Sequence, residues 1–96
     1  MTNTKYKIER TNRFKKDYKK MKTKNFFDER EFIRVVTLLA NDEILPEKYC
    51  NHLLEPKNKG IWECHIKPDW LLMYTKSKNL LVLTLTRTGT HSDLFI

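Results

Sequence analysis

The 96-residue sequence has little glycine or proline and no long apolar run. With two glycines and three prolines, it contains neither a flexible linker nor a glycine-rich phosphate loop. Its longest apolar run, WLLMY at 70–74, is far shorter than the roughly 20 residues of a membrane span. The first ten residues contain no signal-peptide core. We therefore expect one domain over residues 1–96, in the cytoplasm and without membrane contact.

The sequence also lacks the patterns that bind metals or cofactors. Cys50 and Cys64 have neither the spacing of zinc ligands nor that of a redox pair, and reduced thiols are expected in a cytosolic protein. No Cys/His spacing indicates zinc, no acidic cluster indicates magnesium, and no serine lies in a nucleophile elbow. We therefore expect no metal and no cofactor, which leaves acid–base chemistry by side chains.

Positive charge is concentrated near the start of the chain. Residues 1–24 hold ten Lys/Arg against Glu9 and Asp17, whereas residues 25–96 hold nine against ten acidic residues. The net charge of +7 therefore arises from one segment. A basic segment of this kind is typical of a protein that binds a polyanion or an acidic partner, although a solvated helix face has the same composition.

This basic segment is predicted to form a strand at residues 6–9 and a helix at 12–21. Thr11 or Asn12 can cap the helix. Apolar residues at helical spacing form its buried side, namely Phe14, Tyr18 and Met21. The outer side carries the candidates for binding a polyanion, which are Lys15, Lys16, Lys19 and Lys20.

A second helix is predicted to begin after Asp28, which forms a variant capping box with Glu31, and to end near Ala40. The two helices are expected to form a hairpin. A short strand or extended stretch is predicted at 52–54, and strands are predicted at 61–67, 70–76 and 80–87. This order indicates an α+β protein, with an N-terminal strand and helical hairpin packed on one face of a small antiparallel sheet and a short C-terminal turn or helix.

Three histidines, His52, His65 and His91, are the candidates for acid–base chemistry. His65 lies with Glu63 on the polar side of its strand, and Asp69 follows in the turn. A single histidine is more often structural than catalytic, but strand ends and loops commonly carry sites. An RNA phosphodiester suits such a set, because its 2′-hydroxyl is an internal nucleophile and the reaction needs only a base, an acid and cations.

The C-terminal segment RTGTHSDLFI is rich in functional groups for a chain end. Gly89 ends the last strand, and Thr90 with Asp93 can cap a short helical turn. His91 then takes the first helical position, where a helix N-terminus attracts phosphate. Phe95 follows one turn later and either stacks on a base or fills the core.

Three further side chains were each open to two interpretations. Trp62 alternates with Cys64 on the strand at 61–67, which favours the core. Trp70 is either a core-edge residue or a platform for a base. Arg87 is either a surface charge or a phosphate clamp, and its position beside the C-terminal histidine favours the clamp.

Two blocks, WECHIKPDWLLMY at 62–74 and LTLTRTGTHSDLF at 83–95, resemble the YafQ-type branch of the RelE/ParE toxin superfamily. The basic first helix and NHLL at 51–54 extend the resemblance over nearly the whole chain. It implies a RelE-like fold and the toxin of a bacterial type II toxin–antitoxin pair, a metal-independent endoribonuclease that cuts mRNA in the ribosomal A site. The implied partners are the ribosome, mRNA and a small, partly disordered, DNA-binding antitoxin, whose complex with the toxin binds operator DNA and represses the operon.

The resemblance also implies roles for individual residues. The acid–base positions of the family match His52, His65, Asp69 and His91. His91 is expected to be the general acid, with His65 or Asp69 as the base and His52 in support. Arg87 is the implied phosphate-side cation, and Phe95 the substrate-side aromatic residue.

Two other functions remain open at this point. One is a ParE-like inhibitor that binds DNA gyrase without enzymatic activity. The other is a nucleic-acid-binding module without chemistry. Neither needs three histidines and an aspartate near one sheet face, so this set favours the nuclease.

Overall fold

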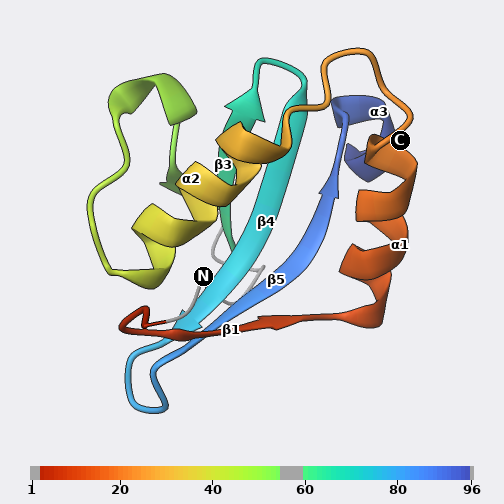
Figure 1. Ribbon diagram of the computed structural model, residues 1–96. Coiled ribbons are helices and arrows are strands. Elements are labelled where there is room, and N and C mark those ends of the chain that lie inside the picture. The colour runs from red at the N-terminus through yellow and green to blue at the C-terminus, as the bar shows by residue number, and fades with distance from the viewer. Residues whose placement is uncertain (1–2, 55–59, 96) are drawn as a thin grey trace.

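The computed structural model describes residues 3–54 and 60–95. Its elements follow the predicted order, with ends shifted by up to two residues. They are β1 (Lys7–Arg10), α1 (Asn12–Met21), α2 (Glu29–Ala40), the 3-10 turn η1 (Glu47–Tyr49), β2 (His52–Leu53), β3 (Trp62–Lys67), β4 (Trp70–Ser77), β5 (Val82–Gly89) and α3 (His91–Phe95) (Figure 1).

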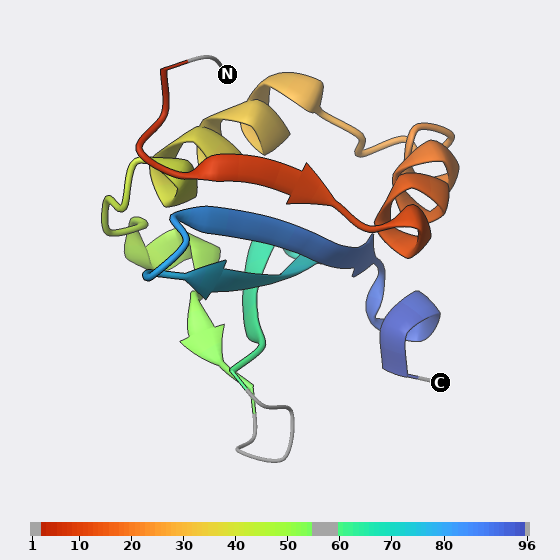
Figure 2. The ribbon, with the colours of Figure 1, turned by 90° about the horizontal axis from the view of Figure 1, so that it is seen from below.

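The five strands form one sheet in the order β1-β5-β4-β3-β2. The pairs β2–β3, β3–β4 and β4–β5 are antiparallel. β1, however, runs parallel to β5, with Ile8 opposite Leu83, and Figure 2 shows the two arrows side by side in the same direction. The α+β class is confirmed, but the sheet is mixed rather than wholly antiparallel. Tight turns fix the direction of β4 and β5, whereas the long helical connection after β1 allows either direction for that strand.

Helix α1 extends the edge of β5 where β1 ends. The last register pair of β1 is Arg10 with Leu85. Beyond it, the N-cap residue Thr11 donates its hydroxyl to the Thr86 carbonyl at 2.8 Å and accepts the Phe14 amide at 3.0 Å. The cap therefore starts the helix and also satisfies a carbonyl at the sheet edge.

Helix α2 lies across the sheet in Figure 1 and supplies much of the core. Its predicted cap is confirmed, because Asp28 accepts the Glu31 amide at 3.2 Å. Phe32, Val36 and Leu39, which recur at helical spacing along α2, are all buried. Aromatic contacts join the two helices, since the rings of Tyr18 and Phe32 lie 4.8 Å apart.

Two apolar residues expected inside are instead exposed. Trp62 is 36% exposed, because it begins β3 opposite Leu53 of the edge strand β2, which is itself exposed. Leu81 is predicted to share one side of the strand at 80–87 with Leu83 and Leu85. It lies before β5, in a turn with φ of 54°, and is 43% exposed.

The two cysteines and the helices agree with the short apolar runs and isolated thiols of the sequence. Cys50 and Cys64 are both free, and burial raises the pKa of the Cys64 thiol to about 12. Within residues 3–54 and 60–95, no helix has the length and apolar content to cross a membrane.

Candidate active site

The C-terminal segment turns sharply after β5 and forms the short helix α3. The two halves of its capping box are present, because the Asp93 amide donates to the Thr90 hydroxyl at 3.1 Å and the Thr90 amide donates to Asp93 at 3.0 Å. Gly89 permits this turn, since a Cβ at that position would lie 2.9 Å from the Cβ of Asp93. The sequence therefore places His91 at the start of a well-defined helical turn.

His91 is held by the carboxylate of Asp69. The Nδ1 atom of His91 lies 2.7 Å from Oδ1 of Asp69, and the His91 amide donates to the same oxygen at 2.9 Å. These bonds, the amide bond first, lower the pKa of Asp69 below its usual value, so the carboxylate remains an acceptor. Nδ1 then carries the proton of this bond, and Nε2 is the nitrogen left for proton exchange.

The rings of His65 and Phe95 both lie near that of His91. The His65 ring meets the His91 ring edge to face, with centroids 5.7 Å apart. The Phe95 ring lies 6.4 Å from that of His91 and is 54% exposed. Of the two interpretations of Phe95, the core plug is therefore excluded, and an exposed ring beside an imidazole remains.

His52 occupies a different environment on β2. It pairs in register with Glu63 of β3, whose side chain shares a face with that of His65. Its Nδ1 lies 2.7 Å from the Cys50 carbonyl, and its Nε2 lies 3.4 Å from Oε1 of Glu63. Glu63 is 5% exposed, and its Oε2 has no hydrogen-bond partner in the described part of the chain.

Arg87 is held by Asp17 of α1. Nε and Nη2 of Arg87 donate to the two carboxylate oxygens of Asp17 at 2.8 and 3.0 Å. These bonds raise the pKa of the guanidinium, which is cationic in any case. Sequence reasoning did not predict the pairing of Asp17 with Arg87, and it placed Glu63 beside His65 but not as the partner of His52. The only signal for Asp17 was its position as the sole acidic residue of α1.

Trp70 is a core residue, and its assignment as a binding platform is wrong. It is fully buried, its ring stacks on that of Phe32 at 6.0 Å, and Nε1 donates to the Thr88 hydroxyl at 2.8 Å. The residue begins β4 on the side that faces the helices, so the alternation of the strand directs the ring inward rather than toward the histidines.

The predicted basic surface of α1 is present. Lys15, Lys16, Lys19 and Lys20 are all exposed. Lys20 differs from the others because its Nζ lies 2.9 Å from Oδ1 of Asp93 in α3. The hydrogen bond from the Thr90 amide, and to a smaller extent the contact with Lys20, lower the pKa of Asp93 to about 2.

Residues 6–96 match the family model of the bacterial toxin of type II toxin–antitoxin systems, YafQ. The mRNA interferase toxin YafQ of Escherichia coli (strain B / BL21-DE3) is 38% identical over 89 residues, which cover 92% of this chain and 94% of that protein. The chain belongs to the YafQ family of bacterial type II toxins. This confirms the resemblance seen in the sequence.

Solved structures of bacterial toxins agree with this assignment. One in the DinJ–YafQ complex of E. coli has a TM-score of 0.84 at 35% identity, covering 95% of this chain and 99% of that one. A metal-bound toxin from Helicobacter pylori has a TM-score of 0.86 at 41% identity, covering 94% and 99%. In this YafQ-family chain, no group of three or more His, Cys, Asp or Glu among the described residues fits a metal ion.

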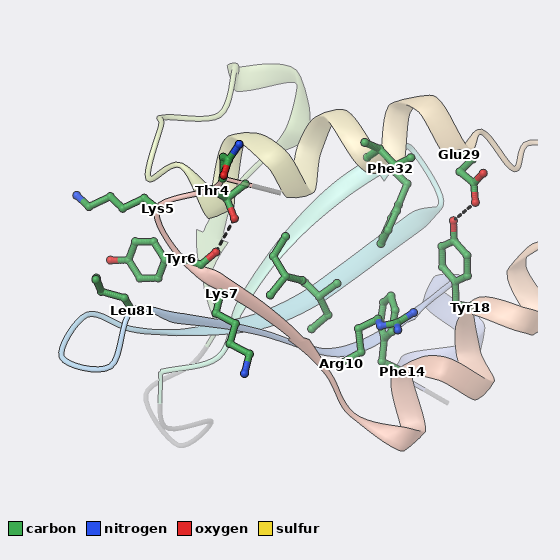
Figure 3. Close-up of a pocket in the computed structure, with 14 residues that line it drawn as sticks. Thr4, Lys5, Tyr6, Lys7, Arg10, Phe14, Tyr18, Glu29, Phe32 and Leu81 are labelled. Atoms are coloured by element: carbon green, nitrogen blue, oxygen red, sulfur yellow. Dashed lines mark hydrogen bonds between the residues drawn. The ribbon is translucent and has the colours of Figure 1, made fainter. Parts of the chain in front are cut away.

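This YafQ-family chain also has an open groove of about 820 Å³ beside β1, shown in Figure 3. Phe14 and Phe32 line it with other apolar side chains, and Lys5, Lys7 and Arg10 supply charge at its border. None of the histidines lines this groove. The histidine site is therefore a surface cluster on α3 and the β3–β4 turn, separate from this cavity.

Proposed function

We propose that this chain is the toxin of a type II toxin–antitoxin pair and acts as an mRNA interferase. The observation that carries the proposal is the exposed pair of His91 and Asp69 with His65 in edge contact. The name of the E. coli relative, an mRNA interferase toxin, supports the same activity. A gyrase inhibitor needs no such cluster.

The proposed reaction is attack by the 2′-hydroxyl of RNA on the adjacent phosphorus. His65 accepts the proton of the 2′-hydroxyl, and Nε2 of His91 donates a proton to the departing 5′-oxygen. Asp69 is the weaker candidate for the base, because one of its oxygens already binds both the amide and the ring of His91. The products are a 2′,3′-cyclic phosphate and a 5′-hydroxyl, without any metal ion or cofactor.

The remaining site residues are proposed to bind rather than to exchange protons. The guanidinium of Arg87 balances charge on the phosphate, and Phe95 stacks on a base. His52 supports the site from β2. Proton transfer by a positioned group contributes about 10²- to 10⁴-fold to a rate, so His65 and His91 carry most of the expected effect.

The proposed substrate is mRNA on the ribosome, which places the action in the cytoplasm. Lys15, Lys16 and Lys19 would contact ribosomal RNA phosphates. An antitoxin, as in the DinJ–YafQ complex, would neutralise the protein, and operator DNA would be bound only through that complex.

The activity is tested with purified protein, programmed ribosomes and free mRNA. We expect cleavage of ribosome-bound mRNA, with cyclic phosphate ends, and little cleavage of free mRNA. The proposal would be contradicted if the protein did not cleave mRNA, or if it inhibited DNA supercoiling by gyrase at the concentrations used for cleavage.

Docking is tested by replacing Lys15, Lys16 and Lys19 with Glu. Ribosome binding should weaken and its salt dependence should flatten, because fewer counterions are released from RNA. Melting temperature serves as the control for folding. Unchanged affinity and salt slope would exclude this surface as the ribosome contact.

A further inference from the structure

Asp17 is an exception on a helix of otherwise basic charge. It is the only acidic residue of α1, where it stands between Lys16 and Lys19. Those lysines are exposed, whereas the Asp17 side chain is only 13% exposed. An acidic residue on a basic helix commonly pairs with a residue three or four positions away. Asp17 instead contacts a residue 70 positions away in the sequence.

The carboxylate of Asp17 accepts three hydrogen bonds from the end of β5. Oδ2 accepts Nε of Arg87 at 2.8 Å and the Thr88 amide at 3.2 Å, and Oδ1 accepts Nη2 of Arg87 at 3.0 Å. The backbone bond fixes the carboxylate on the strand, and the two guanidinium bonds fix the plane of the arginine. A freely moving surface ion pair has neither constraint.

The position of Arg87 in the sheet connects this contact to the candidate site. Arg87 pairs with Met73 of β4, Met73 with Glu63 of β3, and Glu63 with His52 of β2. These four residues form one row across the sheet. Two residues further along β3, beyond the row of Cys64, Leu72 and Thr88, another row runs from His65 through Leu71 to Gly89, two residues before His91.

The geometry points to Asp17 as a positioning residue that holds the Arg87 guanidinium for the phosphate of the RNA. A guanidinium has five N–H groups, and Asp17 occupies Nε and one hydrogen of Nη2. Both hydrogens of Nη1 and one of Nη2 therefore remain for phosphate oxygens. The inference rests on the proposed nuclease function and adds a residue of α1 to its machinery.

This role predicts that Asp17 acts on the cleavage step and only through Arg87. Misplacement of a reacting or stabilising group by about 1 Å can cost about 10²-fold in rate. We therefore expect Asp17→Asn to lower the single-turnover cleavage rate on programmed ribosomes by about 10²-fold while ribosome affinity is retained. Asp42→Asn is the matched control. Asp42 likewise accepts a hydrogen bond from a cationic side chain, Nζ of Lys76 at 2.8 Å, but it lies outside the site.

A double-mutant cycle separates positioning from a general structural role. On an Arg87→Ala background, Asp17→Asn should cause almost no further loss, because the group that it positions is absent. Arg87→Lys should lose cleavage like Asp17→Asn, since lysine keeps the charge but not the two-pronged contact. Melting curves accompany every variant.

The outcomes are distinct. Inactive wild type would overturn the proposed nuclease function itself. Two results would overturn this inference alone. One is a wild type that cleaves mRNA together with an equally active Asp17→Asn variant. The other is an equal loss of cleavage rate from Asp17→Asn with and without Arg87. If Asp17→Asn does not fold, Arg87→Lys decides, because wild-type cleavage by that variant would show that the two-pronged contact is dispensable.

Discussion

His91 and His52 both lie against a carboxylate, but the two pairs differ in solvent access. The side chains of His91 and His52 are similarly exposed, at 55% and 49%, but the side chain of Asp69 is 57% exposed and that of Glu63 only 7%. Both ring nitrogens of His52 lie near acceptors, while His91 uses only Nδ1 among the described residues. The pair of His91 and Asp69 is therefore suited to proton exchange with a substrate, and the pair of His52 and Glu63 to fixed support.

The strongest test of this difference is to remove each imidazole. His91→Ala should reduce ribosome-dependent mRNA cleavage by about 10²- to 10⁴-fold, because the general acid is lost. The variant should retain its melting temperature, since residue 91 is exposed. His52→Ala should cause a smaller loss. A larger effect at residue 52 with folding intact would reverse the assignment of the two pairs.

Asp69→Asn should have the next largest effect. The side-chain amide of asparagine is neutral and would not hold the His91 ring as the carboxylate does. We therefore expect about 10²-fold slower cleavage from the misplaced imidazole. Single-turnover rates as a function of pH provide the measurement. A wild-type rate and pH profile in this variant would show that Asp69 does not orient His91.

Glu63→Gln should cause a loss of about tenfold, equivalent to about 1.4 kcal/mol, which is close to the lower end of the range for a hydrogen bond to a charged group. Glutamine keeps the shape of the side chain but removes the negative charge beside His52. Cleavage rates of this variant on the wild-type and His52→Ala backgrounds test the coupling. Equal losses on both backgrounds would mean that Glu63 acts independently of His52.

The smallest expected effect concerns acid and the anchoring of α3. The pKa of Asp93 is about 2, below the usual value of 3.8, so this carboxylate stabilises the folded tail above pH 4. That stabilisation should fade as pH falls from about 4 toward 2. Hydrogen exchange at the Thr90 amide, followed over this range, should accelerate in the wild type.

Asp93→Asn is the control for this effect. It should remove the pH dependence in that window and slow cleavage only a few-fold at neutral pH, because Thr90 still caps the helix. The His91 contact with Asp69 would remain. An unchanged exchange profile in the variant would assign the acid sensitivity to another group, such as Asp69.

Much of the site could be recognised from sequence, but not its supports. His65, Asp69, His91 and Phe95 lie in two short blocks near a turn and a chain end, and the structure brings them together. Arg87 was recognised as a cation, but its partner Asp17 is 70 residues away and belongs to a segment interpreted only by its net charge. For Trp70 the sequence leaves core and binding platform equally open, because its place beside Asp69 does not reveal which face of β4 it occupies.

Local patterns in the sequence determined the helices with their Thr11 and Asp28 caps, most strands and the turn that presents His91. These features depend on residues two to four positions apart within one element. Tertiary structure alone decided the parallel pairing of β1, the exposure of Trp62 and the burial of Glu63. It also decided the contact from Asp17 to Arg87. Each of these depends on which distant segments meet across the sheet, and no local spacing encodes such a meeting.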